Sequence, residues 1–124
     1  MFKETDLRTT GQFFDKYNLL NIHFEKEGRD LEELVLILTD SIKDRINKES
    51  RIEESTYYIV PNYLHTYETD SQREVLEVNC TFISKSLPGN VAPDSARAAL
   101  DINTKEVLIC EVSYEEITRE QYPF

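Results

Sequence analysis

The side chains that could carry catalysis or hold a metal are few in this sequence and stand far apart. His23 and His65 are the only histidines, and neither has an acidic partner at the spacing of a motif such as HExxH. A zinc site normally needs more nitrogen or sulfur ligands than any cluster of this chain offers. GxSxG is absent, and the only three glycines, Gly11, Gly28 and Gly89, are too scattered for a phosphate-binding loop. The sequence therefore predicts no catalytic residue, no metal and no cofactor.

The cysteines and the paired carboxylates also give no indication of a catalytic site. Cys80 and Cys110 stand on apolar faces of predicted strands, without a CxxC motif, which favours two buried thiols over a disulfide or a nucleophile. Neighbouring acids such as Glu32 and Glu33 are frequent, but adjacent side chains of a helix or strand point apart, so they do not form an acid–base pair by sequence alone. We interpret these acids as a solvated face.

Residues 56–69, TYYIVPNYLHTYET, have the most unusual composition in the chain and hold four of its seven tyrosines. Tyrosine gives a large amphipathic contact area and is enriched in protein interfaces. The alternative is an ordinary strand on which each ring packs on one side and keeps its hydroxyl in water. Pro61 cannot donate to a strand ladder, which places it at a sheet edge or a bulge. We predict a partner-binding surface made of Tyr57, Tyr58, Tyr63, His65, Tyr67 and Glu68.

Two helices are predicted before this segment. Phe13, Tyr17, Leu20 and Phe24 share one helical face and predict a helix over about residues 6–26, although alternation within residues 18–25 also fits a short strand. Asp30 begins a clearer helix as its N-cap, with a glutamate three residues later. Its apolar stripe, which continues to residue 48, consists of Leu31, Leu34, Val35, Leu38, Ile42 and Ile46.

Strands are predicted after it. Residues 73–87 alternate in such a way that Leu76, Val78, Cys80 and Phe82 share one face, which predicts a long strand with these four side chains buried. Residues 95–102 also alternate, and a short helix that begins at Pro93 is the alternative there.

The last strand is predicted over residues 106–113, after a hairpin loop. Leu108, Cys110 and Val112 are expected on one of its faces, and apolar Val107 and Ile109 on the other indicate a central or doubly covered strand. Residues 113–116, SYEE, repeat the capping-box pattern and predict a final helical turn.

Together these elements predict one α+β domain over residues 1–124, with the N-terminal helices packed on a curved antiparallel sheet of about four strands. Cystatin-like and nuclear-transport-factor-2-like cones share this coarse order of elements. The similarity is one of element order and brings no functional residue with it.

Charge and composition limit the partners. The 124 residues include 24 acidic and 14 basic ones, for a net charge of −10. Nucleic acids and anionic membranes repel such a chain, whereas a basic protein is compatible with it. The first ten residues, MFKETDLRTT, lack the apolar core of a signal peptide, and there is no apolar run of membrane-spanning length, so we expect a cytoplasmic protein.

We therefore predict a small acidic cytoplasmic binding protein without catalytic activity. It would occlude a basic, toxin-like or nuclease-like partner, in the manner of immunity proteins and other inhibitors. One alternative is a small-ligand carrier or enzyme with a pocket in the concave sheet. Another is a structural subunit, phage-encoded for example, that assembles through a sheet edge. A homodimer formed through a sheet edge is a further expectation.

Overall fold

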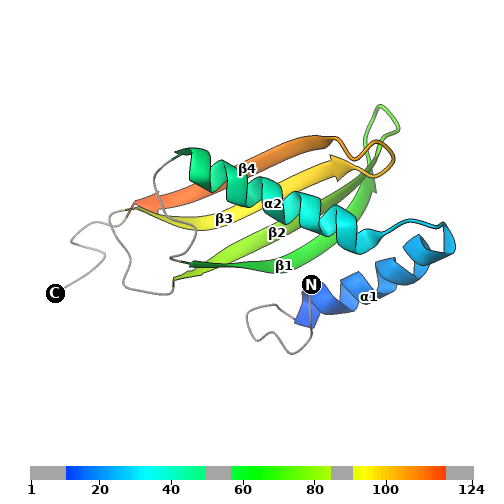
Figure 1. The fold of residues 1–124 in the computed structure, drawn as a ribbon, viewed down its shortest axis with the longest axis horizontal. Helices are drawn as coiled ribbons and strands as arrows, with labels where there is room; N and C mark the ends of the chain where they lie inside the picture. The colour runs from blue at the N-terminus through cyan, green and yellow to red at the C-terminus, as the bar shows by residue number, and fades with distance from the viewer. Residues whose placement is uncertain (1–10, 50–56, 85–90, 117–124) are drawn as a thin grey trace.

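The computed structural model describes residues 11–49, 57–84 and 91–116, which form two helices and four strands (Figure 1). The strands form one antiparallel open sheet in the order β1-β2-β3-β4, so that β1 and β4 are its edges. Both helices pack against this sheet, which confirms the predicted α+β arrangement. The bounds are α1 Gly11–Lys26, α2 Leu31–Glu49, β1 Tyr57–Glu68, β2 Glu74–Ser84, β3 Val91–Asp101 and β4 Val107–Glu116.

Residues 18–25, which the sequence left open between a helix and a strand, belong to helix α1. Phe13 and Phe24 are buried and Tyr17 packs against the core, as one helical face requires, so the strand alternative for residues 18–25 is wrong. The part of the predicted helix over residues 6–10 lies outside the described residues. Gly28 ends the helix with a φ of 71°, and the N–H of Arg29 donates to the carbonyl of Phe24 at 2.8 Å.

Helix α2 begins as the capping pattern predicts, because the backbone N–H of Glu33 donates to Asp30 Oδ1 at 3.2 Å. Helix α2 lies across β2, β3 and β4, and α1 lies along β1. Neither helix in the described part of the chain has both the length and the apolar character that a transmembrane helix needs. The predicted stripe of α2 is buried at every position: Leu31, Leu34, Val35, Leu38, Ile42 and Ile46.

Strand β2 carries the centre of the core. Leu76, Val78 and Cys80 are each at most 1% exposed, as their alternation predicts. They face the two helices together with Ala98 and Leu100 of β3. The side chain of Phe82 lies outside the described part of the chain.

Strand β3 is a strand over its whole length, so the helix that could have begun at Pro93 does not form. Strand β4 differs from its prediction in two ways. It is an edge strand and not a central one. Residues 113–116 continue it, because Ser113 pairs with Ser95 and Glu116 with Val91, so the predicted helical turn does not begin there. Residues 117–124 lie outside the described part of the chain.

Cys110 and Val112 share the core-facing side as predicted, and a register shift explains why Leu108 and Val107 were assigned to the wrong faces of β4. Ile109 pairs with Ala99 and Val107 pairs with Leu100, which leaves Leu108 as the extra residue of a bulge. The bulge reverses the alternation at this point. Val107, and not Leu108, therefore packs against the core on the same face as Cys110.

Candidate functional site

Three of the predicted site residues, Tyr63, His65 and Tyr67, form one row along β1 on the sheet face turned away from the helices. Leu64 points to the opposite face and is buried in the core. The ring centroids of Tyr63 and His65 lie 4.9 Å apart and those of His65 and Tyr67 5.5 Å apart, both edge-to-face. Tyr63 remains 41% exposed and Tyr67 38% exposed. We call these three residues the tyrosine row.

A bulge at Pro61 turns the row to this face. Pro61 pairs with Cys80, whose side chain is in the core, whereas Tyr63 pairs with Asn79 on the opposite face of β2. Asn62 is the extra residue between them, and it shifts the alternation by one. The prediction that Pro61 marks an edge or a bulge is therefore confirmed in both senses, because β1 is also an edge strand.

Glu77 of β2 lies beside the row and is only 7% exposed. The hydroxyl of Tyr67 donates to its Oε1 at 3.2 Å, and Nδ2 of Asn79 donates to its Oε2 at 3.3 Å. His65 Nε2 lies 3.3 Å from Oε2, and Arg97 Nη2 of β3 lies 3.7 Å from Oε1. Three strands thus supply the partners that a buried carboxylate requires.

We call Glu77 and its four partners, Tyr67, His65, Asn79 and Arg97, the Glu77 cluster. It affects the pKa of Tyr67 and extends the polar surface of the sheet towards β4. Burial raises the pKa of the Tyr67 hydroxyl, and the negative charge of Glu77 and the hydrogen bond to it raise it further. The hydroxyl is therefore a hydrogen-bond donor at neutral pH. Arg97 also lies 3.8 Å from Glu111 of β4, beside a polar hollow of about 290 Å³. The arrangement offers fixed polar groups and exposed rings.

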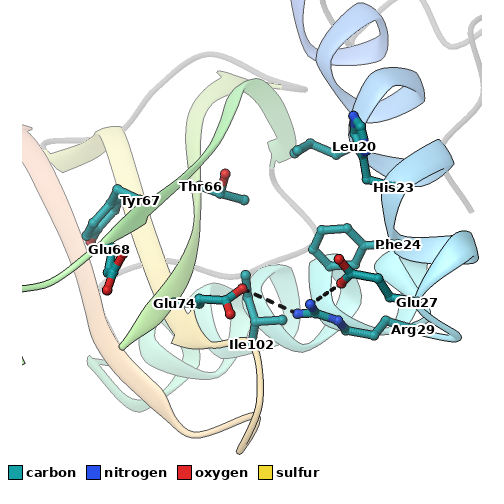
Figure 2. A pocket seen from close by; sticks show the side chains of 10 residues that line it. All are labelled: Leu20, His23, Phe24, Glu27, Arg29, Thr66, Tyr67, Glu68, Glu74 and Ile102. Carbon is teal, nitrogen blue, oxygen red and sulfur yellow. Dashed lines mark hydrogen bonds and ion pairs between the residues drawn. The ribbon is translucent and has the colours of Figure 1, made fainter. Parts of the chain in front are cut away.

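A second feature is a cavity of about 390 Å³ between α1 and the end of β1, shown in Figure 2 and called here the α1–β1 groove. Its apolar part is formed by Leu20, Phe24 and Ile102. Thr66 of β1 also lines it (Figure 2). Three carboxylates also line it: Glu27, Glu68 and Glu74.

Arg29 holds two of these carboxylates in place. It forms an ion pair with Glu27, and its Nη1 lies 3.6 Å from Glu74 Oε2 (Figure 2). Its guanidinium carbon lies 5.4 Å from the ring centroid of Phe24, which adds a cation–π contact. Glu68 is exposed at the end of β1.

The acidic excess is concentrated at this end of the molecule. Residues 23–33, 68–74 and 101–106 hold ten acidic and four basic residues, a net charge of −6 out of the −10 of the whole chain. Ion pairs join the three segments, since Lys105 Nζ lies 2.9 Å from Glu33 and Arg73 Nη1 lies 3.4 Å from Glu106, in addition to the pair of Arg29. We call these three segments the acidic end.

The predicted site residues do not all come together. Glu68 is not part of the row, but it lines the α1–β1 groove together with Tyr67. The side chains of Tyr57 and Tyr58 lie outside the described part, although their backbones pair with Ser84 and Ile83. Three members of the cluster were not predicted as site residues: Glu77, Asn79 and Arg97. The available signal was that all three are polar residues at alternate positions of strands.

The two thiols differ from each other. Cys80 is buried as predicted, and burial raises its pKa to about 12. Cys110 is only half-buried, contrary to the prediction, and its Sγ donates to the carbonyl of Ser41 at 3.4 Å. Across residues 11–49, 57–84 and 91–116, no group of three or more His, Cys, Asp and Glu side chains is placed to hold a metal ion. The chain matches no protein-family model, no curated protein and no solved structure.

Proposed function

We propose that this protein is a small binding protein that covers a basic protein partner with the tyrosine row. The observation that carries the proposal is the row itself, in which two exposed tyrosines flank a histidine on an open sheet face. Tyr67 is held by its hydrogen bond to Glu77, so its ring loses little rotational freedom when a partner binds. Rigid aromatic side chains of this kind are typical anchors of protein interfaces.

Charge supports a basic partner. The row ends at Tyr67, next to Glu68, where the acidic end with its net charge of −6 begins. A field of this sign raises the association rate of a basic protein and repels nucleic acid. Toxins and nucleases that act on nucleic acid are basic partners of this class, and the protein would inhibit them by occlusion. We place it in the cytoplasm, where free thiols such as Cys80 persist.

The carboxylates of the groove favour binding over catalysis. Glu27 and Glu74 are 53% and 54% exposed, and both pair with Arg29. A general acid or base normally lies in a position that is better shielded from water. These two carboxylates are better suited to recognising a cation.

A photo-cross-linker tests the surface. The residue p-benzoylphenylalanine at position 63 should capture the partner in lysate of the native host, and the same group at exposed Asp40 of α2 should not. The captured protein is then purified. Equal capture at both positions, or capture at position 40 alone, would argue against the tyrosine row.

Truncation then measures the contribution of the rings. Tyr63→Ala and Tyr67→Ala should each weaken binding of the purified partner by about 2 kcal/mol or more, mainly through faster dissociation. Leu19→Ala is the matched control, because Leu19 is 60% exposed on α1. Binding that tolerates both tyrosine substitutions in isothermal calorimetry would exclude the row as the interface.

A further inference from the structure

We propose that the α1–β1 groove binds an extended basic segment of the partner as an added strand along the free edge of β1. This inference rests on the proposed function and names the part of the partner that is recognised. The groove lies between edge strand β1 and helix α1, and Thr66 lines it (Figure 2). A strand added at such an edge is held by main-chain hydrogen bonds and selected by its side chains.

The pairing pattern shows which backbone groups face the free edge. The N–H of Thr69 donates to the carbonyl of Arg73 at 3.0 Å, so Thr69 belongs to a hydrogen-bonded pair of the β1–β2 ladder. Such pairs alternate in antiparallel sheets, which turns Tyr67 and His65 towards β2. Leu64, Thr66 and Glu68 consequently direct their N–H and carbonyl groups away from β2, on the side where no strand pairs within the described part of the chain.

The available edge has defined ends. Pro61 has no N–H, and the bulge beside it interrupts the alternation, so an added strand cannot continue past Tyr63. At the other end the chain turns after Glu68. Residues 64–68 therefore remain, a length of roughly 17 Å, which a segment of about six residues covers.

The side chains of the groove select the segment. Alternate residues of an added strand point to the two faces of the sheet, so one set enters the groove and the other lies beside the tyrosine row. The stem of a lysine or arginine in the groove would pack on Leu20 and Phe24, with its cationic head near Glu27 (Figure 2). An anionic side chain would meet three carboxylates against the single guanidinium of Arg29, which is already paired with two of them.

A peptide titration of the full protein, followed by amide NMR, tests this inference. The probe is an acetylated and amidated peptide of alternating Lys and Val, about six residues long. Its binding should saturate, shift the amide signals of Leu64, Thr66 and Glu68, and slow the hydrogen exchange of these three amides. The same peptide with Glu in place of Lys should not bind. Equal binding of both peptides, or shifts confined to other strands, would overturn the proposal.

Two further measurements separate strand addition from simple charge attraction. A Lys–Val peptide that is N-methylated at alternate residues keeps its charge but cannot donate to the edge, and it should bind about tenfold more weakly. Thr66→Pro removes an N–H at the edge and should weaken binding of the unmodified peptide by a similar factor. Thr66→Val keeps that N–H and should leave the binding unchanged. Unchanged binding of the N-methylated peptide to the wild-type protein would overturn strand addition even if Thr66→Pro failed to fold.

The partner itself distinguishes this inference from the proposed function. If Tyr63→Ala weakens binding of the partner but the Lys–Val peptide does not bind at the groove, the row remains the interface and strand addition is wrong. If instead the peptide binds at the groove, while Tyr63→Ala and Tyr67→Ala leave the affinity for the partner unchanged, the proposed use of the row is wrong and strand addition stands.

Discussion

At the scale of single residues, the feature that organises the open face is the carboxylate of Glu77. An ionised carboxylate that is 7% exposed is costly unless charge and hydrogen bonds compensate it. Tyr67, Asn79, His65 and Arg97 provide this compensation. The position of the exposed Tyr67 ring therefore depends on a residue that a partner would scarcely touch.

The titration of Tyr67 tests this dependence. In Glu77→Gln the negative charge next to the hydroxyl is lost, so the pKa of Tyr67 should fall towards its ordinary value. It should stay above that value, because burial is the largest cause of the shift. Spectrophotometric titration measures this change, and the difference from Tyr67→Phe in each background isolates Tyr67. A Tyr67 pKa that Glu77→Gln leaves unchanged would exclude the coupling.

Asp101 gives a second prediction, for stability at acid pH. Its Oδ1 accepts hydrogen bonds from the backbone N–H groups of Thr104 at 3.0 Å and Asn103 at 2.8 Å. The bond from Thr104 is the largest cause that holds its pKa below the ordinary value, and the charge of Arg73 adds to it against the effect of burial. Because its pKa is lower in the folded protein than in the unfolded chain, the Asp101 carboxylate stabilises the fold fully above pH ~4. This stabilisation is lost as the pH falls through the folded-state pKa.

Asp101→Asn should therefore unfold more easily than the wild type at neutral pH. The difference in the free energy of unfolding should shrink as the pH falls below about 4, where the wild-type carboxylate is protonated in the unfolded chain and then in the folded one. Urea denaturation between neutral and acid pH measures it. A difference that grew on acidification would contradict the assignment.

At the scale of elements, the end of α1 depends on the backbone of Gly28. Its φ of 71° is unfavourable for any residue with a Cβ, but a Cβ added there meets no atom within 4 Å. Gly28→Ala should thus cost about 1 kcal/mol of stability from backbone conformation alone. Gly28→Asn is the matched control and should cost less, because asparagine adopts this region more readily. An alanine variant as stable as the wild type in urea denaturation would contradict this prediction.

The sequence predicted secondary structure and buried faces best where apolar residues recur with a single period and pack against a single core. The stripe of α2 and the alternation of Leu76, Val78 and Cys80 record burial directly, so these elements and their faces were predicted correctly. Strand β4 was different because Val107–Cys110 is apolar at every position and carries no alternation from which a face can be assigned. The bulge at Leu108 then depends on pairing with β3, which local sequence does not record.

The candidate site was predictable only in part for the same reason. Composition singled out the tyrosine segment, but the bulge at Asn62 decides that Tyr63, His65 and Tyr67 share the open face. Glu77 meets His65 because of the register between β1 and β2. A register is a property of two distant segments, so one strand pattern alone could not identify Glu77 as the centre of the cluster.

At the scale of the whole molecule, the uneven distribution of charge predicts how a basic partner associates. Exposed carboxylates at the acidic end act at a distance, and each is worth little once the complex has formed. The double variant Glu25→Gln/Asp70→Asn removes two exposed acids of this end. Its association rate with the purified partner should fall about two- to threefold at low salt, with dissociation unchanged.

The matched control is Asp40→Asn/Asp44→Asn, which removes two exposed acids of α2 outside the acidic end. It changes the net charge by the same amount, so a response to total charge alone would slow both variants equally. Steering by the acidic end should slow the first variant more, and the difference should vanish at about 1 M salt, where charges are screened within ~3 Å. Stopped-flow association over a series of salt concentrations measures both rates. Equal slowing of the two variants would exclude the acidic end as the steering surface, and association independent of salt would exclude a basic partner.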